Sequence, residues 1–138
     1  MRSFFDTNVL VYMFDEGERG KQRRAMQLFE DAIDQGRALL STQVLQEFFV
    51  VVTRRLSPPM PYELAGRVIR AFTALPIVQV DPDIIVNAIE LTRRYRFSFW
   101  DGLIIEAALR GGAKTLYTED LQHGQVIETL QVENPFLS

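Results

Sequence analysis

Residues 1–14 read MRSFFDTNVLVYMF, a short apolar run, a polar break and a second apolar run. The first five residues are typical of a buried strand, and Asp6 follows them directly. Residues 9–14 fit a short helix after the polar residues 6–8. The chain therefore opens with a strand that passes at once into a helix.

Short apolar runs alternate with segments of helical periodicity along the rest of the chain. Further strands are predicted at residues 38–40, 77–80, 115–118 and within 126–132. Further helices are predicted at residues 21–35, 42–54, 61–74, 82–95 and 99–110. Their ends are marked by Gly36, by Asp81-Pro82 and by Gly111. Because parallel strands require long crossover connections, this alternation predicts an α/β fold, a three-layer α/β/α sandwich with a parallel sheet.

Length and composition limit the classes of protein to consider. The 138 residues fit one domain, 1–138, and 47% hydrophobic content suits an ordered core. The absence of cysteine excludes disulfides, thiolate metal sites and cysteine nucleophiles. The apolar runs, residues 48–52 among them, are all far shorter than the ~20 residues that span a bilayer. We therefore expect a soluble, cytoplasmic protein that makes no membrane contact.

A net charge of −3 argues at first against a nucleic-acid partner. The distribution of charge weakens that argument, because several of the 18 acidic residues are candidates for a metal site. Arginines also cluster at positions 23–24, at 54–55, and at 93, 94 and 96. Such clusters are equally typical of solvated helix ends, so charge alone does not decide the partner.

Two acidic residues follow predicted strands. In open parallel sheets, sites form at the carboxyl ends of the strands, which are the positions of Asp6 and Asp120. Taken singly, Asp6 also fits a helix N-cap and Asp120 a solvated turn. Glu119 is the weaker candidate, because neighbouring side chains do not easily point the same way.

Two more acidic residues lie on predicted helices. Glu47 shares a helical face with Val44 and Val51, where an ionised carboxylate is costly unless it is paired or bound to a metal. A salt bridge to a nearby arginine, at position 54 or 55, is the alternative. Asp101 stands three residues after Ser98, the spacing of a capping box, which also fits a rigidly held site residue.

Together, these carboxylates from separate segments would converge and repel one another without a cation. Oxygen ligands suit Mg²⁺ or Mn²⁺, and magnesium bound by few carboxylates is completed by substrate phosphate. The set therefore favours metal-assisted phosphodiester hydrolysis. His123 is the single histidine, which excludes a two-histidine ribonuclease, and its polar surroundings predict a surface position.

At these residues the chain resembles the PIN-domain family, particularly the VapC-type toxin ribonucleases. The resemblance covers nearly the whole chain, in order. It is carried by residues 5–10 (FDTNVL), 43–48 (QVLQEF), 98–101 (SFWD) and 116–120 (LYTED). The chain departs from the family at residues 121–123 (LQH), where a second aspartate often follows the first.

The resemblance implies a short five-stranded parallel sheet and a metal-dependent endoribonuclease that uses Mg²⁺ or Mn²⁺. It implies an acidic cluster of Asp6, Glu47, Asp101 and Asp120, with Asp6 and Asp101 as direct ligands. Asn8, Ser98 and Thr118 would orient these carboxylates. It also implies an RNA substrate, a homodimer and a cognate antitoxin, for which residues 48–52 and the proline-rich break after them are candidate docking surfaces.

Two other readings remain open on the sequence. A haloacid-dehalogenase-like phosphatase would use Asp6 as its nucleophile, but it needs an aspartate two residues later, where this chain has Asn8. A non-catalytic PIN-like module would bind RNA or protein through a degenerate site. Metal-assisted hydrolysis does not need the 2′-hydroxyl, so the choice of RNA over DNA rests on the resemblance.

Overall fold

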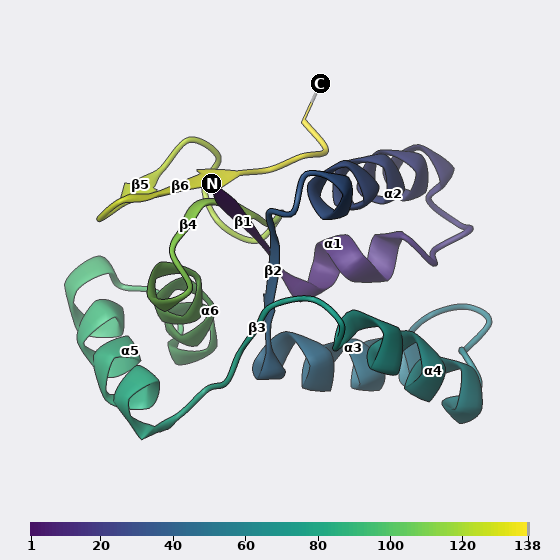
Figure 1. The fold of residues 1–138 in the computed structure, drawn as a ribbon, viewed down its shortest axis with the longest axis horizontal. Helices are drawn as coiled ribbons and strands as arrows, with labels where there is room; N and C mark the ends of the chain where they lie inside the picture. The colour runs from purple at the N-terminus through teal and green to yellow at the C-terminus, as the bar shows by residue number, and fades with distance from the viewer. Residues whose placement is uncertain (138) are drawn as a thin grey trace.

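The computed structural model describes residues 1–137, which form a mainly parallel sheet between two layers of helices (Figure 1). The strands, in chain order, are β1 (Arg2–Phe5), β2 (Ala38–Ser41), β3 (Ile77–Val78), β4 (Ala113–Tyr117), β5 (Val126–Ile127) and β6 (Leu130–Glu133). Their spatial order is β3-β2-β1-β4-β6-β5, and every pair except β5–β6 is parallel. The predicted α/β fold is confirmed.

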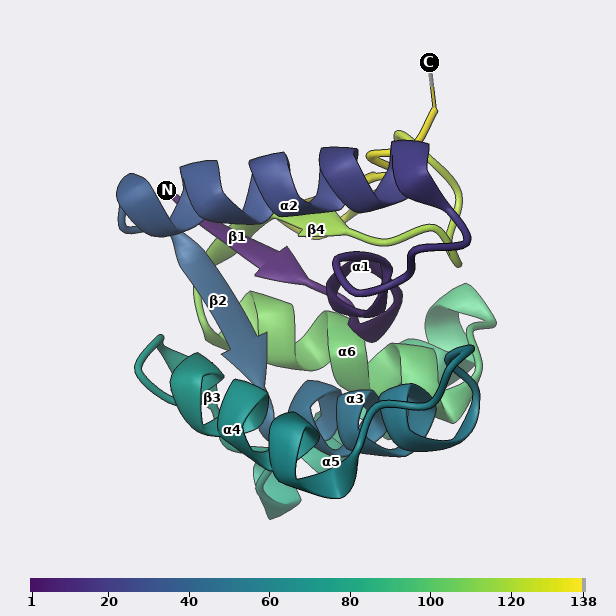
Figure 2. The ribbon, with the colours of Figure 1, turned by 90° about the vertical axis from the view of Figure 1, so that its right-hand side faces the viewer.

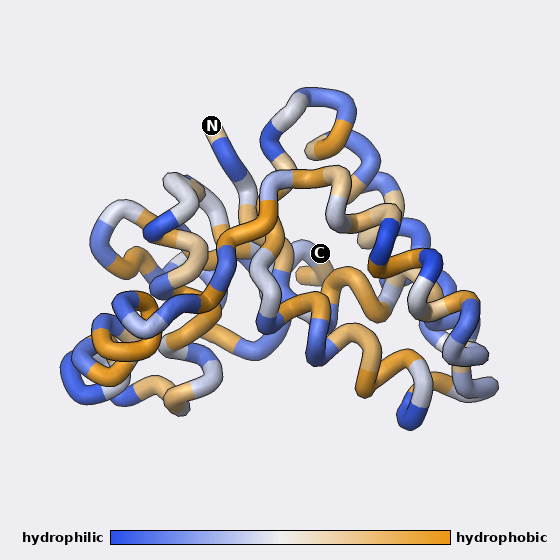
Figure 3. The backbone as a smooth tube through the Cα atoms, turned by 60° about the horizontal axis from the view of Figure 1, so that its bottom comes forward, coloured by the Kyte–Doolittle hydropathy of each residue, from blue (hydrophilic) through white to orange (hydrophobic). Residues whose placement is uncertain are grey.

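The helices are α1 (Thr7–Tyr12), α2 (Arg19–Asp34), α3 (Thr42–Arg54), α4 (Tyr62–Phe72), α5 (Pro82–Tyr95) and α6 (Phe99–Arg110). Helices α1 to α4 lie on one side of the sheet and α5 and α6 on the other (Figure 1). In Figure 3, hydrophobic and hydrophilic stretches alternate along the helices, as expected for elements that bury one face. Among residues 1–137, no helix is both long and apolar enough to cross a membrane.

The sheet has six strands where five were expected, because the last predicted strand is a hairpin. Ile127 pairs with Leu130, so the chain reverses through two residues, and the first of them, Glu128, has a φ of 55°. An antiparallel pair needs only such a short turn, whereas a parallel neighbour would need a crossover. Only β6 of this hairpin pairs with β4.

Aromatic side chains connect the helices to the central strand. The ring of Phe5 in β1 meets that of Phe29 in α2 at 5.0 Å, and Phe29 meets Phe72 in α4 at 5.7 Å. Phe72 in turn meets Phe48 in α3 at 5.3 Å. Burying each such ring stabilises the fold by roughly 2–3 kcal/mol. This packing fixes α3, and therefore Glu47 beside Phe48, relative to the end of β1.

The strand order reverses at β1, which is where a site is expected in an open α/β sheet. The chain runs outward from β1 to β3 and then returns to place β4 on the other side of β1. Figure 2 shows β1 pointing at the start of α1. The N–H of Asp6 donates to the carbonyl of Tyr117 over 3.0 Å, so the β1–β4 pairing continues one residue beyond β1.

Candidate active site

Asp6 is held at the N-cap of α1 with both carboxylate oxygens occupied. Oδ1 accepts the N–H of Thr7 at 2.7 Å, and Oδ2 accepts the hydroxyl of Thr118 at 2.8 Å. The residue is only 5% exposed. The N-cap position expected from the sequence therefore coincides with a rigid position at the carboxyl end of the central strand.

The electrostatic environment of Asp6 disfavours its charge. Burial raises the pKa of Asp6 from 3.8 to about 7, although hydrogen bonds from Thr118 and Thr7 oppose that change. The negative charges of Asp120 and Glu47 raise this pKa further. No ion pair within residues 1–137 includes Asp6. Its ionised form therefore lacks a compensating positive charge from the described part of the protein.

Glu47 lies on α3, half-buried, and accepts hydrogen bonds at both oxygens. The hydroxyl of Thr7 donates to Oε1 at 2.7 Å, and Nε2 of Gln43 donates to Oε2 at 3.3 Å. Thr7 therefore links Glu47 to Asp6, since its N–H binds Asp6 and its hydroxyl binds Glu47. In the described part of the chain, neither Arg54 nor Arg55 forms the alternative salt bridge to Glu47.

Asp120 follows β4 and is oriented by Asn8 and Thr118. The amide nitrogen of Asn8 donates to Oδ2 of Asp120 at 3.0 Å and contacts the hydroxyl of Thr118 at 3.3 Å. The N–H of Asp120 also donates to that hydroxyl at 3.1 Å. Fully buried Thr118 therefore bonds to Asp6, Asn8 and Asp120 at once.

Asp101 stands in the first turn of α6. The hydroxyl of Ser98, the N-cap, accepts the N–H of Asp101 at 3.1 Å, which agrees with the capping spacing in the sequence. Burial raises the pKa of Asp101. A hydrogen bond with Ser98 opposes this change, and the negative charges of Asp120 and Glu47 add to it. Asp101 therefore lies close enough to Asp120 and Glu47 for their charges to act on its carboxyl group.

Glu119 belongs to a different group of side chains. It pairs with Lys21 at 2.8 Å and accepts a hydrogen bond from the hydroxyl of Tyr12. Burial alone would raise the pKa of Glu119, but the hydrogen bonds from Lys21 and Tyr12 outweigh it and lower that pKa. Lys21 and Tyr12 were not predicted, and no local signal marks them, because they meet Glu119 across 98 and 107 positions.

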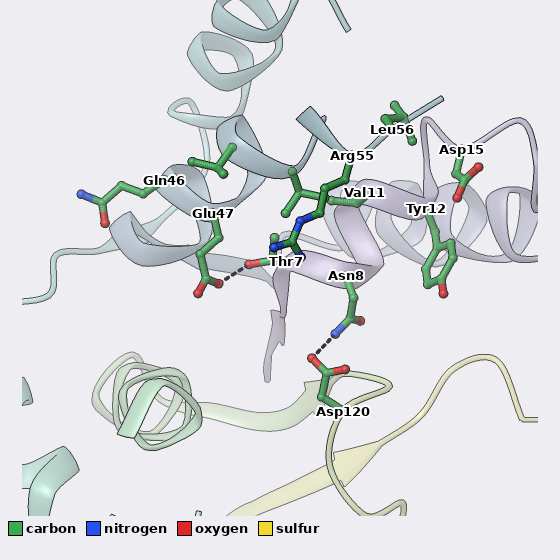
Figure 4. Close-up of a pocket in the computed structure, with 12 residues that line it drawn as sticks. Thr7, Asn8, Val11, Tyr12, Asp15, Gln46, Glu47, Arg55, Leu56 and Asp120 are labelled. Carbon is green, nitrogen blue, oxygen red and sulfur yellow. Dashed lines mark hydrogen bonds between the residues drawn. The ribbon is translucent and has the colours of Figure 1, made fainter. Parts of the chain in front are cut away.

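The four predicted carboxylates surround one end of the sheet without forming a compact chelate. Figure 4 shows Glu47 reaching in from α3 and Asp120 from the loop after β4, with Thr7 and Asn8 between them. Among residues 1–137, no three acidic or histidine side chains are grouped closely enough to hold one metal ion. The carboxylates of Asp6, Glu47 and Asp120 instead each accept a hydrogen bond from a neighbouring Thr, Asn or Gln side chain.

Three features nevertheless fit a hard cation with its water shell. The donors are all oxygen atoms, the preference of Mg²⁺ and Mn²⁺. Asp6 lacks a positive neighbour among the described residues, and its pKa is raised to about 7. Buried Oε1 of Gln43, on the side chain that binds Glu47, has no hydrogen-bond partner within residues 1–137. Buried polar atoms nearly always have a hydrogen-bond partner, so we expect a water molecule or a ligand to bind Oε1 of Gln43.

A groove of about 670 Å³ opens beside these residues, between α1, α3 and the loop after β4 (Figure 4). Glu47 and Asp120 line it together with the apolar side chains of Val11, Val50 and Leu56. Arg55, which is exposed at the end of α3, also lines the groove. The groove therefore joins the carboxylates to an apolar wall and a positive charge.

The sequence profile described as "PIN domain" matches residues 3–127. The chain belongs to the PIN-domain family. This membership removes the haloacid-dehalogenase-like reading, and Asn8, two residues after Asp6, binds Asp120 through its amide. His123 lies at the surface of the PIN domain, as predicted, and its Nδ1 accepts the N–H of Asn134.

Solved structures share this PIN fold at low sequence identity. A toxin–antitoxin complex from Klebsiella pneumoniae matches with a TM-score of 0.72 and 22% identity, covering 97% of this chain and 98% of that one. VapC20 of Mycobacterium tuberculosis, described as a sarcin-ricin loop cleaving toxin, matches with a TM-score of 0.65 and 21% identity. That match covers 86% of this chain and 89% of VapC20.

A third structure, DNA-bound VapBC from Salmonella typhimurium, matches with a TM-score of 0.65 and 19% identity over 96% of this chain and 97% of that one. Identities this low establish the fold and do not by themselves carry over an activity. A comparison with curated protein sequences finds no significant match.

Proposed function

We propose that this PIN domain is a metal-dependent endoribonuclease and the toxin of a toxin–antitoxin pair. The observation that carries the proposal is the environment of Asp6, a buried carboxylate next to two further acidic residues. Its pKa is raised to about 7, and no described residue supplies the missing positive charge. Strongly perturbed carboxylates at the switch point of an α/β sheet are typical of functional sites.

Asp6, Asp101, Glu47 and Asp120 are the proposed ligands of Mg²⁺ or Mn²⁺. When bound, the ion would lower the pKa of a water molecule and neutralise charge on the phosphate. Thr118 and Asn8 orient Asp6 and Asp120 through hydrogen bonds, and Ser98 caps the helix that carries Asp101. Such neighbours fix the direction of carboxylate oxygens and conserve the geometry of a site.

The groove provides a path for a single RNA strand next to the carboxylates. Its apolar wall at Val11 and Val50 suits contact with bases, and Arg55 suits contact with a phosphate. This distribution accounts for RNA binding by a chain with a net charge of −3, because few cations are needed when a metal holds the scissile phosphate. RNA is favoured over DNA by the family and by the activity described for VapC20, not by the mechanism.

A cognate antitoxin and a homodimer complete the proposal. The matching structure from Klebsiella pneumoniae is described as a toxin–antitoxin complex, and that from Salmonella typhimurium as DNA-bound VapBC. The groove beside α3 is the surface on which an inhibitor would both dock and obstruct the carboxylates. Co-expression with the product of a neighbouring short reading frame, followed by purification and a cleavage assay, tests this part.

The central experiment compares labelled RNA with DNA of the same sequence. The protein is incubated with Mg²⁺, with Mn²⁺ and with EDTA, alongside Asp6→Asn and Asp101→Asn. We expect RNA cleavage that requires metal, leaves 5′-phosphate and 3′-hydroxyl ends, and falls at least ~100-fold in either variant. Products with 2′,3′-cyclic phosphates would contradict attack by water, and metal binding without cleavage would favour a non-catalytic binding module.

A further inference from the structure

A second polar cluster, formed by Tyr12, Lys21 and Glu119, lies beside the candidate site, and Tyr12 also lines the groove. Tyr12 belongs to α1, Lys21 to α2, and Glu119 to the loop after β4. Nζ of Lys21 binds Oε2 of Glu119 at 2.8 Å and the hydroxyl of Tyr12 at 3.2 Å. The hydroxyl of Tyr12 donates to the other oxygen of Glu119. Both oxygens of Glu119 are thus occupied by protein groups.

The ammonium group of Lys21 is confined by more than its hydrogen bonds. It lies 4.7 Å from the ring centre of Tyr12 and 5.4 Å from that of Phe136, distances typical of cation–π contacts. The Lys21 side chain is 34% exposed and that of Glu119 27%. An ion pair shielded to this degree, with additional hydrogen bonds, holds its geometry better than an exposed pair.

The cluster contacts the loop that carries Asp120. Glu119 stands between Thr118 and Asp120, and its backbone N–H donates to Oδ1 of Asn8 at 3.3 Å. The amide of Asn8 donates to Asp120, while Tyr12, one helical turn later on the same face of α1, holds the Glu119 side chain. Asn8 and Tyr12, on one face of α1, therefore hold two neighbouring residues of this loop, Asp120 and Glu119.

We propose that Lys21 and Tyr12 are positioning residues that hold Glu119 away from the acidic site and thereby direct Asp120 toward it. Glu119 is a loop anchor in this arrangement, not a metal ligand. The proposal rests on the proposed function for its effect on cleavage, but its structural part concerns the metal-free protein. Without the anchor, the loop loses its fixed direction and Asp120 samples orientations that face away from Asp6.

The experiment uses the full chain with Lys21→Met, Tyr12→Phe and Glu119→Gln. Lys21→Met keeps the apolar stem and removes the charge, and Tyr12→Phe removes only the hydroxyl. The matched control is Arg94→Met, which removes an ion pair of 3.1 Å to Glu128 elsewhere on the molecule. Lys21→Arg tests rescue by a conservative cation.

Three readouts separate positioning from general stability. The first is hydrogen exchange of residues 116–122 without metal, the second is Mn²⁺ affinity by calorimetry, and the third is the division of the cleavage defect between kcat and KM. We expect Lys21→Met and Glu119→Gln to lose protection in this segment and to bind Mn²⁺ about tenfold more weakly, the usual scale for residues that orient ligands. The defect should appear in kcat, Lys21→Arg should restore part of it, and Arg94→Met should match the wild type.

The outcomes distinguish this proposal from the proposed function. If the wild type does not cleave RNA, the nuclease assignment fails, while hydrogen exchange and Mn²⁺ affinity still decide whether the cluster positions the loop. Protection and affinity equal to those of Arg94→Met in both Lys21→Met and Glu119→Gln would overturn the proposal. So would a loss of Mn²⁺ affinity in Glu119→Gln with none in Lys21→Met, because Glu119 would then be a ligand itself.

Discussion

The hydroxyl of Thr118 donates a 2.8 Å hydrogen bond to Asp6 across 112 positions of sequence. The same oxygen accepts the N–H of Asp120, so one buried hydroxyl connects the ends of the two neighbouring strands β1 and β4. Asp6 and Asp120 are therefore held in a fixed relation by a side chain that is itself not acidic.

Replacing Thr118 by Val should loosen this connection. The change preserves shape but leaves Oδ2 of buried Asp6 without a donor, which typically costs about 1–3 kcal/mol of unfolding free energy. It should also weaken Mn²⁺ binding. Denaturant unfolding and calorimetry measure both effects. Thr115→Val, in strand β4 three residues before Thr118, is the control, since the Thr115 side chain makes no hydrogen bond within residues 1–137. Equal behaviour of the two variants would remove Thr118 from the site.

The raised pKa of Asp6 predicts how the stability of the metal-free protein depends on pH. Between 3.8 and about 7 the folded state binds a proton that the unfolded state releases, so the unfolding free energy falls as pH rises through this window. The decrease from this group should reach about 4 kcal/mol, at about 1.36 kcal/mol per pKa unit. Asp6→Asn lacks this titration and should be the more stable protein in EDTA at pH 7.5. Denaturant curves of both proteins at several pH values measure the difference, and a constant difference from pH 4 to 7.5 would contradict the prediction.

The stabilisation of the protein by a bound metal should depend on pH in the opposite direction, and increase as the pH rises. A cation binds ionised Asp6, so binding releases a proton when the pH lies below about 7. We expect Mn²⁺ to raise the melting temperature more at pH 7.5 than at pH 5.5, and metal-dependent cleavage to slow as pH falls below 7. Differential scanning calorimetry with and without Mn²⁺ measures the first effect. The increase in melting temperature caused by Mn²⁺ should disappear in Asp6→Asn. If the increase persists in that variant, the metal binds elsewhere.

Arg55 provides a test of the groove as the RNA path. It lines the groove, whereas neighbouring Arg54 does not, although both are exposed. Arg55→Gln should weaken RNA binding several-fold and reduce the slope of log affinity against log salt by about 1, the effect of one lost phosphate contact. Titration of labelled RNA against the Asp6→Asn background avoids cleavage during the measurement. Arg54→Gln is the control, and an equal effect of both variants would point to general attraction and not to the groove.

Much of the fold was predictable because its signals are local. The predicted bounds of α3, α5 and α6 agree with the structure. The caps explain this agreement, since Asp81 binds the N–H of Ile84 and Ser98 that of Asp101, each three residues away. Other bounds differ: the first helix, predicted at 9–14, is Thr7–Tyr12, and the third strand, predicted at 77–80, is Ile77–Val78. The last strand was not predicted to be a hairpin, because the residue type of Glu128 gives no indication that the turn there has a positive φ.

The candidate site divides in the same way. The positions of Asp6 and Asp120 after apolar strands, and of Glu47 on an apolar helix face, could be identified in the sequence. The sequence by itself determined the alternation of strands and helices, and with it the carboxylates that follow the strands, because these depend on periodicity and capping over a few residues. Thr118 was expected from the resemblance to orient a carboxylate, but only the tertiary structure decided that it binds Asp6 and that Lys21 binds Glu119. Those contacts join residues about a hundred positions apart, and their geometry exists only once the strands have paired and the helices have packed against the sheet.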